Sequence, residues 1–326
     1  MQELGCPDGR PELLALRALK LGDLLVAVPA IHALRRAFPQ HRLVLAVPAW
    51  LEPVVDLVDG VDALLPTPGL DDPLPLERGR IDIAVNLHGS GPESRGLVDA
   101  LGARVSIVHR VEELDGFAGG DAEAEQAPPA WRAELHERRR WVRLVGAYGV
   151  AGDPGEVRLR SAPAIPELEG ATVLHVGAAY GSRLWPVARF AAVAEALAAE
   201  GHRVVFTGGA GERERALGVA TAAGLAQERV LAGRLDLGRF AGVIQRARLV
   251  VSADTGAAHL ASAYGTPSVV LFGPASPEQW GPPPGPHVVL TDARLRRGDV
   301  FAPDPDPALL AVTVDDVLAA AARVSR

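Results

Sequence analysis

A turn within residues 249–273 carries residue types that can bind an anion. The strand expected before it is apolar and mostly β-branched, as in a parallel strand that helices cover on both faces. Asp254 and Thr255 are helix-capping types, and Gly256 lets a ligand approach the backbone. Because N–H groups at the start of a helix point toward a bound anion, the turn suits a phosphate. The same spacing also fits an ordinary strand–helix–strand unit without a ligand.

A carboxylate stands at a similar turn near the start of the chain. Asp23 ends the turn Lys20-Leu21-Gly22-Asp23, between an apolar segment and a helical pattern. An aspartate in this place commonly caps the helix. It can also take the proton from an acceptor hydroxyl that lies within hydrogen-bond reach. Lys20 can orient Asp23 or meet an acidic acceptor.

A third segment with polar side chains, residues 177–186, is a long loop that contains Ser182 and Arg183 and ends in Trp185-Pro186. Proline suits the first position of a helix, so a helix is predicted to start at Pro186. The simplest interpretation is a loop followed by a buried tryptophan.

These segments lie in a repeated alternation of strand and helix patterns, which predicts parallel sheets with helices on both faces. The linker-like segment 152–170 contains three prolines and separates two such halves. The acidic segment 112–129 is expected to be a mobile loop, and residues 131–149 a helix with its charges toward solvent. The predicted strands are 13–19, 43–47, 62–65, 81–87, 105–108, 171–176, 203–207, 229–231, 249–251, 268–272 and 287–290, and the last helix is 314–326.

Composition bounds the function. The 326 residues are 48% hydrophobic, which suits two ordinary domains, and the net charge of −7 argues against a nucleic-acid binder. A single cysteine, Cys6, excludes an internal disulfide. The N-terminus shows no signal pattern, and no apolar segment is long enough to span a membrane. We expect a cytoplasmic protein that can touch the inner face of the cytoplasmic membrane if its acceptor is a lipid.

Three strings follow one another from the first turn onward: Asp254-Thr255-Gly256-x-x-His259-Leu260-Ala261, Gly265-Thr266-Pro267 and Leu271-Phe272-Gly273-Pro274. Together they closely resemble the signature of glycosyltransferase family 9, the heptosyltransferase family of bacterial cell-envelope assembly. The resemblance implies a GT-B fold, in which two doubly wound Rossmann-like domains face each other across a cleft. It implies an acceptor-binding domain over 1–155 and a nucleotide-sugar domain over 156–326, with a final helix that can pack back on the first.

The resemblance also assigns the donor contacts. The basic residue two positions before Trp-Pro contacts the donor phosphates, and here it is Arg183 where the heptosyltransferases often have lysine; Ser182 can add a hydroxyl contact. Glu212 falls where the family binds the ribose, with Glu214 as the competing candidate. At the signature turn the amides of three residues are expected to meet the diphosphate, His259 to contact the donor, and Asp254 to cap the helix or bond a sugar hydroxyl. The three amides belong to Thr255, Gly256 and Ala257.

On the acceptor side, the Gly22-Asp23 pair matches the family position of the catalytic base, with Lys20 and Gly22 as further candidates. The function implied is an inverting transfer of a heptose or related sugar from an ADP-sugar to an acceptor hydroxyl, in a cell-envelope glycolipid. Arginines of the first half can serve an acidic acceptor or be solvated surface: Arg95, Arg104, Arg110 and Arg138 to Arg140. Two other classes stay open: a sugar-nucleotide epimerase or hydrolase on the same fold, and a non-catalytic nucleotide-sugar binder.

No cofactor or metal is expected. The nine histidines show no paired zinc spacing, and Asp304-Pro305-Asp306 is expected to be a surface loop. The donor phosphates would then be neutralised by Arg183 and the helix N-terminus. Nothing in the sequence indicates an obligate protein partner.

Overall fold

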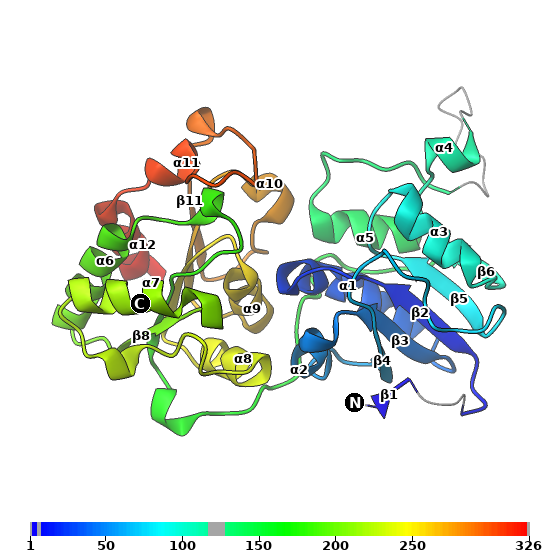
Figure 1. The fold of residues 1–326 in the computed structure, drawn as a ribbon, viewed down its shortest axis with the longest axis horizontal. Helices are drawn as coiled ribbons and strands as arrows, with labels where there is room; N and C mark the ends of the chain where they lie inside the picture. Colours follow the sequence, from blue (N-terminus) through cyan, green and yellow to red (C-terminus); the bar gives the residue numbers. More distant parts are fainter. Residues whose placement is uncertain (1, 5–7, 117–127, 325–326) are drawn as a thin grey trace. The chain divides into compact units, whose positions relative to one another are not determined.

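The computed structural model describes residues 2–4, 8–116 and 128–324, and the chain forms two compact units (Figure 1). Unit 1 comprises Met1–Arg160 and unit 2 comprises Ser161–Arg326. The division lies five residues after the predicted boundary at 155. Cys6 and most of the predicted acidic loop 112–129 lie outside the described residues.

The sheet of unit 1 has six parallel strands in the order β1-β4-β3-β2-β5-β6. Its central strands are buried along their whole length, as their continuous apolar sequences predict. The carboxyl ends of β2, β3, β5 and β6 therefore lie along one edge, where the loops of unit 1 can present side chains. The strands are β1 Gln2–Glu3, β2 Glu12–Leu16, β3 Arg42–Val47, β4 Ala63–Pro66, β5 Ile81–Asn86 and β6 Val105–Ile107.

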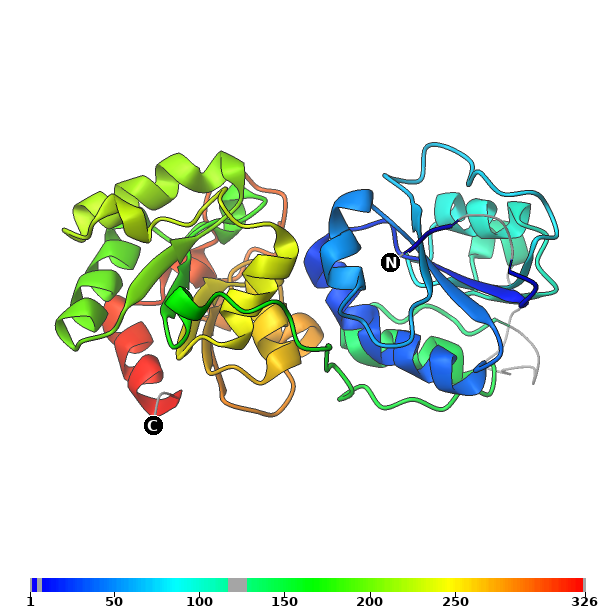
Figure 2. The same ribbon diagram turned by 90° about the horizontal axis from the view of Figure 1, so that it is seen from below.

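Helices cover both faces of this sheet. α1 packs against α5 on one face, and α3 packs on the other (Figure 2). The bounds are α1 Leu21–Ala37, η1 Ala49–Leu51, α2 Glu52–Val55, α3 Pro92–Ala100, α4 Glu112–Asp115 and α5 Glu137–Gly146. The helix predicted over 131–149 was wrong in two respects. It begins only at Glu137, and several of its charged side chains are buried rather than solvated.

Unit 2 contains a five-stranded parallel sheet in the order β11-β10-β9-β7-β8. The strand predicted over 229–231 reduces to a single bridge between Phe206 and Val230. α6, α7 and α12 form one helical layer, and α8 packs with α9 in the other (Figure 1). The strands are β7 Thr172–His175, β8 Val204–Thr207, β9 Leu249–Ala253, β10 Ser268–Leu271 and β11 His287–Leu290. The helices are η2 Pro166–Leu168, η3 Gly181–Arg183, α6 Val187–Ala199, η4 Ala210–Glu212, α7 Arg213–Ala222, η5 Gln227–Arg229, α8 Leu237–Gln245, α9 Gly256–Tyr264, α10 Pro277–Trp280, η6 Ala293–Leu295, α11 Pro307–Leu310 and α12 Val314–Val324.

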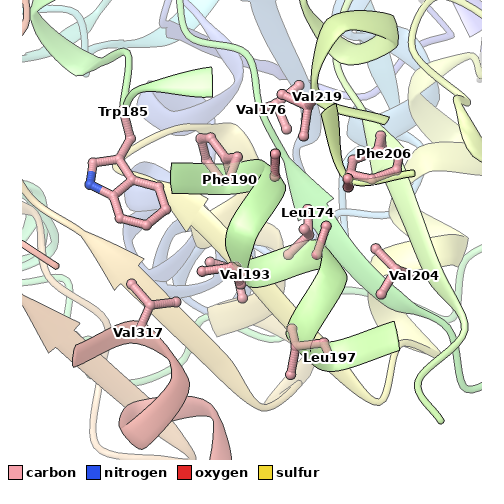
Figure 3. Packing of buried hydrophobic residues seen from close by; sticks show 14 of the residues in the cluster. Leu174, Val176, Trp185, Phe190, Val193, Leu197, Val204, Phe206, Val219 and Val317 are labelled. Carbon is pink, nitrogen blue, oxygen red and sulfur yellow. The ribbon is translucent and has the colours of Figure 1, made fainter. Parts of the chain in front are cut away.

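The core of unit 2 fixes one end of the loop 177–186. Trp185 is fully buried, its ring meets Phe190 edge to face at 5.1 Å, and its Nε1 donates to the carbonyl of Val312 at 3.1 Å (Figure 3). Pro186 is the N-cap of α6, so the helix begins at Val187, one residue after the predicted start. The final helix, α12, packs against α6, β10 and β11 of its own unit. In the described residues no helix is long and apolar enough to cross a membrane.

Candidate functional site

The N-terminus of α9 presents a group of backbone donors. Thr255 is its N-cap, with extended backbone angles, but the Thr255 hydroxyl contacts the Ser252 hydroxyl at 3.0 Å instead of capping the helix. Within the part of the chain that the structure describes, the amides of Thr255, Gly256 and Ala257 form no hydrogen bond. Amides at the first turn of a helix have no partner inside the helix. They are therefore free to receive an anion, as predicted.

Arg183 and His259 lie beside this turn and converge on the carboxylate of Asp254. The Arg183 Nη1 lies 3.4 Å from Asp254 Oδ2 and donates to the Asp254 carbonyl at 3.2 Å, while His259 Nε2 lies 3.6 Å from Asp254 Oδ1. Asp254 is 3% exposed, and its carboxylate orients these two side chains. One prediction was that Asp254 caps the helix, but no side chain caps α9. The Arg183 Nε is buried and without a hydrogen-bond partner in the described residues. A buried unpaired donor beside free amides is what an absent anionic ligand would satisfy.

Ser182 is placed differently from its neighbour Arg183. It is fully buried, and its hydroxyl donates to the Val300 carbonyl at 2.7 Å. Its amide donates to the Ala302 carbonyl at 2.9 Å, and its own carbonyl accepts from the Asp306 amide at 3.0 Å. Ser182 thus ties the loop 177–186 to the segment around 300–306, and no ligand contact can be assigned to it.

Asp306 corrects the expectation that Asp304-Pro305-Asp306 is a surface loop. Its side chain is buried, and its two carboxylate oxygens accept the amides of Ala308 at 2.9 Å and Arg297 at 3.1 Å. It is the N-cap of α11. The carboxylate is therefore engaged in fixing the segment that supports Ser182.

Glu212 lies at the carboxyl end of β7, where its carboxylate covers Gly177. A Cβ atom on Gly177 would lie 2.0 Å from the Glu212 carboxyl carbon, so a larger residue there would displace the carboxylate. The carboxylate accepts the Gly209 amide at 2.5 Å. Glu214, the competing candidate, is exposed on α7. The structure thus brings Glu212, and not Glu214, close to the loop that carries Arg183.

Arg215 is a residue of this site that the sequence interpretation missed. Its Nε donates to the Val176 carbonyl at 2.8 Å, and its Nη2 donates to the Trp185 carbonyl. Burial lowers the pKa of Arg215, and the nearby Glu212 carboxylate opposes that shift. Arg215 clamps both ends of the loop 177–186. A cation one helical turn after a candidate carboxylate was the available signal.

In unit 1, Asp23 lies in the first turn of α1 and does cap the helix. Its Oδ2 accepts the Lys20 amide at 3.2 Å, and its Oδ1 lies 3.6 Å from the Nη2 of Arg17. The side chain remains 25% exposed, so a hydroxyl can reach it. Lys20 is exposed and Gly22 is half-buried in the same turn. The helix cap and an accessible carboxylate are therefore properties of the same residue.

Arg17 is a residue beside Asp23 that the sequence analysis did not identify. It is 2% exposed, it donates to the Asp23 carbonyl at 2.9 Å, and it lies over the Trp141 ring at 4.6 Å. Burial lowers the pKa of Arg17 to about 10, partly offset by Asp23, so the side chain stays cationic near neutral pH. An arginine placed directly after a buried strand and six residues before a candidate base was the signal for its role.

His88, in the loop after β5, completes the surroundings of Asp23. Burial first, and then the charge of Arg17, lower the pKa of His88 to about 4, while Asp23 opposes the shift. Its Nδ1 is buried without a partner in the described residues. The ring is therefore neutral near neutral pH and adds a polar atom beside the carboxylate.

The arginines proposed for an acidic acceptor prove to be mostly engaged. Arg95 pairs with Asp99 and Asp115 at 3.0 Å, and Arg104 pairs with Asp82 at 2.8 Å. The arginines on α5 that are buried, Arg138 and Arg140, are neither solvated surface nor open to an acceptor.

Sequence comparison finds similarity to one family of glycosyltransferases. Residues 156–293 match the sequence model of glycosyltransferase family 9 (heptosyltransferase). The predicted resemblance is confirmed, and the chain is a glycosyltransferase. It is 40% identical over 155 residues to lipopolysaccharide heptosyltransferase 1 of Pseudomonas aeruginosa, which covers 46% of this chain and 42% of that protein. It is 24% identical to lipopolysaccharide heptosyltransferase 2 of Escherichia coli over 79% of this chain and 81% of that one.

Solved structures extend the likeness to the fold of the glycosyltransferase. A family 9 glycosyltransferase from Veillonella parvula has a TM-score of 0.76 at 20% identity, covering 98% of this chain and 97% of its own. An E. coli heptosyltransferase solved with ADP-2-deoxy-2-fluoro heptose has a TM-score of 0.70 at 19% identity, covering 94% and 98%. The predicted GT-B class, with two parallel α/β domains, is confirmed.

Over residues 2–4, 8–116 and 128–324, no three or more histidine, cysteine, aspartate or glutamate side chains are grouped to hold an ion. One structural neighbour, an E. coli glycosyltransferase with a TM-score of 0.59 and 16% identity over 97% of this chain and 76% of its own, is described as iron-containing and dodecameric. That property belongs to the neighbour.

Proposed function

We propose that this glycosyltransferase moves a heptose, or a related sugar, from an ADP-linked donor to an acceptor hydroxyl with inversion. The observation that carries the proposal is the group of unpaired amides at the start of α9, with the buried unpaired Nε of Arg183 beside it. Such a group fits a diphosphate. The names of the relatives, lipopolysaccharide heptosyltransferases, support heptose as the sugar and the lipopolysaccharide core as the acceptor.

The donor would be held by unit 2. Its diphosphate would accept from the amides of 255–257 and from Arg183, whose fork Asp254 orients. The carboxylate of Glu212 would accept from the ribose hydroxyls, and His259 would contact the donor from the first turns of α9. The E. coli neighbour solved with an ADP-fluoroheptose supports adenine as the base. We propose that no metal is needed, because the amides and Arg183 meet the charge of the leaving diphosphate.

The acceptor hydroxyl would be activated in unit 1 by Asp23. Its oxygen attacks the anomeric carbon while the bond from that carbon to the diphosphate breaks on the opposite face. The proton passes to the Asp23 carboxylate, and ADP leaves with the electron pair of the broken bond. Lys20 and Gly22 border the carboxylate on the acceptor side. If the acceptor is a glycolipid, the enzyme would act from the cytoplasm at the inner face of the membrane.

The test uses the purified full chain with a chelator present. ADP-heptose, UDP-glucose and GDP-mannose are supplied in turn, with heptose-deficient lipopolysaccharide as acceptor, and nucleotide release and product mass are followed. We expect release and glycosylated product with ADP-heptose alone. Asp23→Asn should lower kcat about 1000-fold, because a general base contributes factors of this order. Asp236→Asn is the matched control, since Asp236 also caps a helix through its side chain.

Each other outcome removes a part of the proposal. Preference for a uridine or guanosine donor overturns the ADP assignment. Full activity of Asp23→Asn overturns Asp23 as the base. Conversion of ADP-heptose without any acceptor indicates a hydrolase or epimerase, and ADP binding with no turnover on any acceptor indicates a binding protein.

A further inference from the structure

We propose that Arg17 is the positioning residue of Asp23, an inference that rests on the proposed role of Asp23 as the base. Arg17 directly follows the last residue of β2, and Asp23 lies in the first turn of α1. The Arg17 guanidinium contacts both the backbone carbonyl and the side-chain carboxylate of Asp23. Its Nε donates to the Asp23 carbonyl at 2.9 Å, and its Nη2 lies 3.6 Å from Asp23 Oδ1.

Arg17 is itself held from two further elements of unit 1. Its Nη1 donates to the Leu87 carbonyl and lies 3.4 Å from the His88 carbonyl, in the loop after β5. On the α5 side, its Nη2 lies 3.7 Å from Glu137 Oε2, and its guanidinium lies over the Trp141 ring. These contacts leave a long side chain with little freedom. The cation therefore stands at a fixed place next to the carboxylate.

Glu137 and its neighbours brace this arrangement. Glu137 Oε2 accepts the Trp141 Nε1 at 3.0 Å, and Glu137 also forms an ion pair with Arg140. Both carboxyl oxygens of Glu137 thus have partners of their own. A buried carboxylate that is paired and hydrogen-bonded can stay ionised, and it balances the charge of Arg17.

These contacts determine the orientation of the Asp23 carboxylate. Its Oδ2 is aimed by the Lys20 amide and its Oδ1 by Arg17, while the side chain remains 25% exposed for an acceptor. A planar guanidinium fork can hold a carbonyl and a carboxylate at once, whereas a lysine ammonium cannot reproduce that geometry. Arg17 would thus fix the direction of the base.

The chain offers a matched control on the neighbouring strand, β3. Arg42, the first residue of β3, is 4% exposed and its Nη1 lies 3.1 Å from Glu12 Oε1, where Glu12 begins β2. Arg17 follows the other end of β2. Loss of either arginine breaks a buried ion pair in unit 1. Only loss of Arg17 would disturb Asp23.

The experiment compares Arg17→Met, Arg17→Lys, Arg42→Met, Arg42→Lys and Asp23→Asn in the full chain. The transferase assay with ADP-heptose gives kcat and the donor KM, and melting temperatures are measured alongside. We expect Arg17→Met to lower kcat about 100-fold, as misplaced catalytic groups do, with the donor KM changed less than about threefold. Arg17→Lys should lower kcat about 10-fold, because it keeps the charge and loses the fork. Both Arg42 variants should lower the melting temperature and leave kcat within about threefold of the parent.

The kcat and the donor KM together separate positioning from general stability. Loss of Arg17 should lower kcat and leave the donor KM nearly unchanged, because Asp23 would act on the acceptor while the donor would be held by unit 2. A variant that only destabilises unit 1, as the Arg42 variants should, lowers the melting temperature without this fall in kcat. Arg17→Lys should recover about 10-fold of the kcat that Arg17→Met loses, because it restores the charge.

The inference and the proposed function fail in different ways. If the parent transfers heptose and Asp23→Asn does not, but Arg17→Met loses no more kcat than Arg42→Met, positioning by Arg17 is overturned alone. If the parent is inactive, or Asp23→Asn is fully active, the proposed function is overturned and the inference with it. If Arg17→Met does not fold, Arg17→Lys decides the question. A kcat equal to that of the parent contradicts the inference. A kcat about 10-fold lower, in a variant whose melting temperature equals that of Arg42→Lys, supports it.

Discussion

The two candidate sites differ in how their polar groups are satisfied. In unit 2, the amides at the start of α9 and the Nε of Arg183 have no partner among the described residues. In unit 1, the side chains of Asp23, Arg17 and Glu137 are bound to one another and to backbone groups. The first arrangement is incomplete without an anion. In the second, these three side chains are paired without a ligand, and one carboxylate is fixed in place.

This difference predicts where a substitution will be felt. Removing a partner from a satisfied buried network leaves an uncompensated charge, which destabilises the free protein. Removing a donor that has no partner changes little until the ligand arrives, and then it weakens binding. Substitutions in unit 1 should therefore alter stability without ligand, and substitutions at the α9 turn should alter affinity.

Glu137→Gln gives the largest expected effect. It removes the charge that balances two buried arginines, Arg17 and Arg140, and should destabilise unit 1 by about 3 kcal/mol. Urea denaturation measures the loss, and hydrogen exchange in β2 and β5 localises it to unit 1. The affinity for ADP should be unchanged. Glu134→Gln, at an exposed position just before α5, is the matched control. Equal stability of the two variants would show that the network of unit 1 does not carry its stability.

His109 gives the next effect, through pH. It is 1% exposed, its ring lies 5.0 Å from that of Trp131, and both ring nitrogens lack partners among the described residues. Burial, with the charges of Arg143 and Arg140, lowers the pKa of His109 to about 4. In the unfolded chain this group titrates near 6.5, so between these values the unfolded state binds the extra proton.

The lowered pKa of His109 makes unit 1 less stable as the pH falls. The contribution of neutral His109 is complete above about pH 6.5 and is lost as the pH falls toward about 4, amounting to roughly 2–3 kcal/mol. His109→Phe keeps an aromatic ring between the tryptophans and cannot be protonated. Urea denaturation of both proteins at several pH values should give a flatter acid dependence for the variant. Parallel curves below pH 6.5 would exclude His109 as a source of acid sensitivity in unit 1.

How well the sequence predicted the structure depends on the range of the interactions involved. The strands and the α9 turn follow from local patterns, namely β-branched apolar segments and capping residues, and these predictions agree with the structure to within a few residues. The start of α5 was placed six residues too early. Its apolar spacing extends back to Trp131. The residues before Glu137 do not form a helix, and three of their backbone carbonyls accept hydrogen bonds from the Arg140 guanidinium instead.

The polar networks could not be read from local patterns. Arg17 contacts residues 70 and 71 positions away in the sequence, and Glu137 is still more distant from it. A buried arginine looks the same in sequence as a solvated one until the fold brings a carboxylate and an aromatic ring to it. For Ser182 the error went the other way. Its place beside Arg183 in the sequence suggested a ligand contact, but in the fold its hydrogen-bond partners come from residues 300–306.

Gly256→Pro gives the smallest effect and tests the α9 turn most sharply. Gly256 is the first residue of α9, a position at which proline fits because the amide has no partner in the helix. The preceding residue, Thr255, has φ −145° and ψ 176°, the extended conformation that a following proline requires. The variant should therefore keep the helix and remove one donor. Gly256→Ala, which retains the amide, is the matched control.

We expect the melting temperature of Gly256→Pro without ligand to match that of Gly256→Ala, and its Kd for ADP by calorimetry to be about 10-fold higher, since a hydrogen bond to a charged group contributes about 1.5 kcal/mol. Equal affinity of both variants would mean that the diphosphate does not rest on these amides, and the contrast between the units would then lose its ligand-binding half. A melting temperature that falls with an unchanged Kd would mean that the first turn of α9 is satisfied internally, as the Asp23 network is. A lower affinity at constant stability is the result that only an unsatisfied, ligand-directed turn can give.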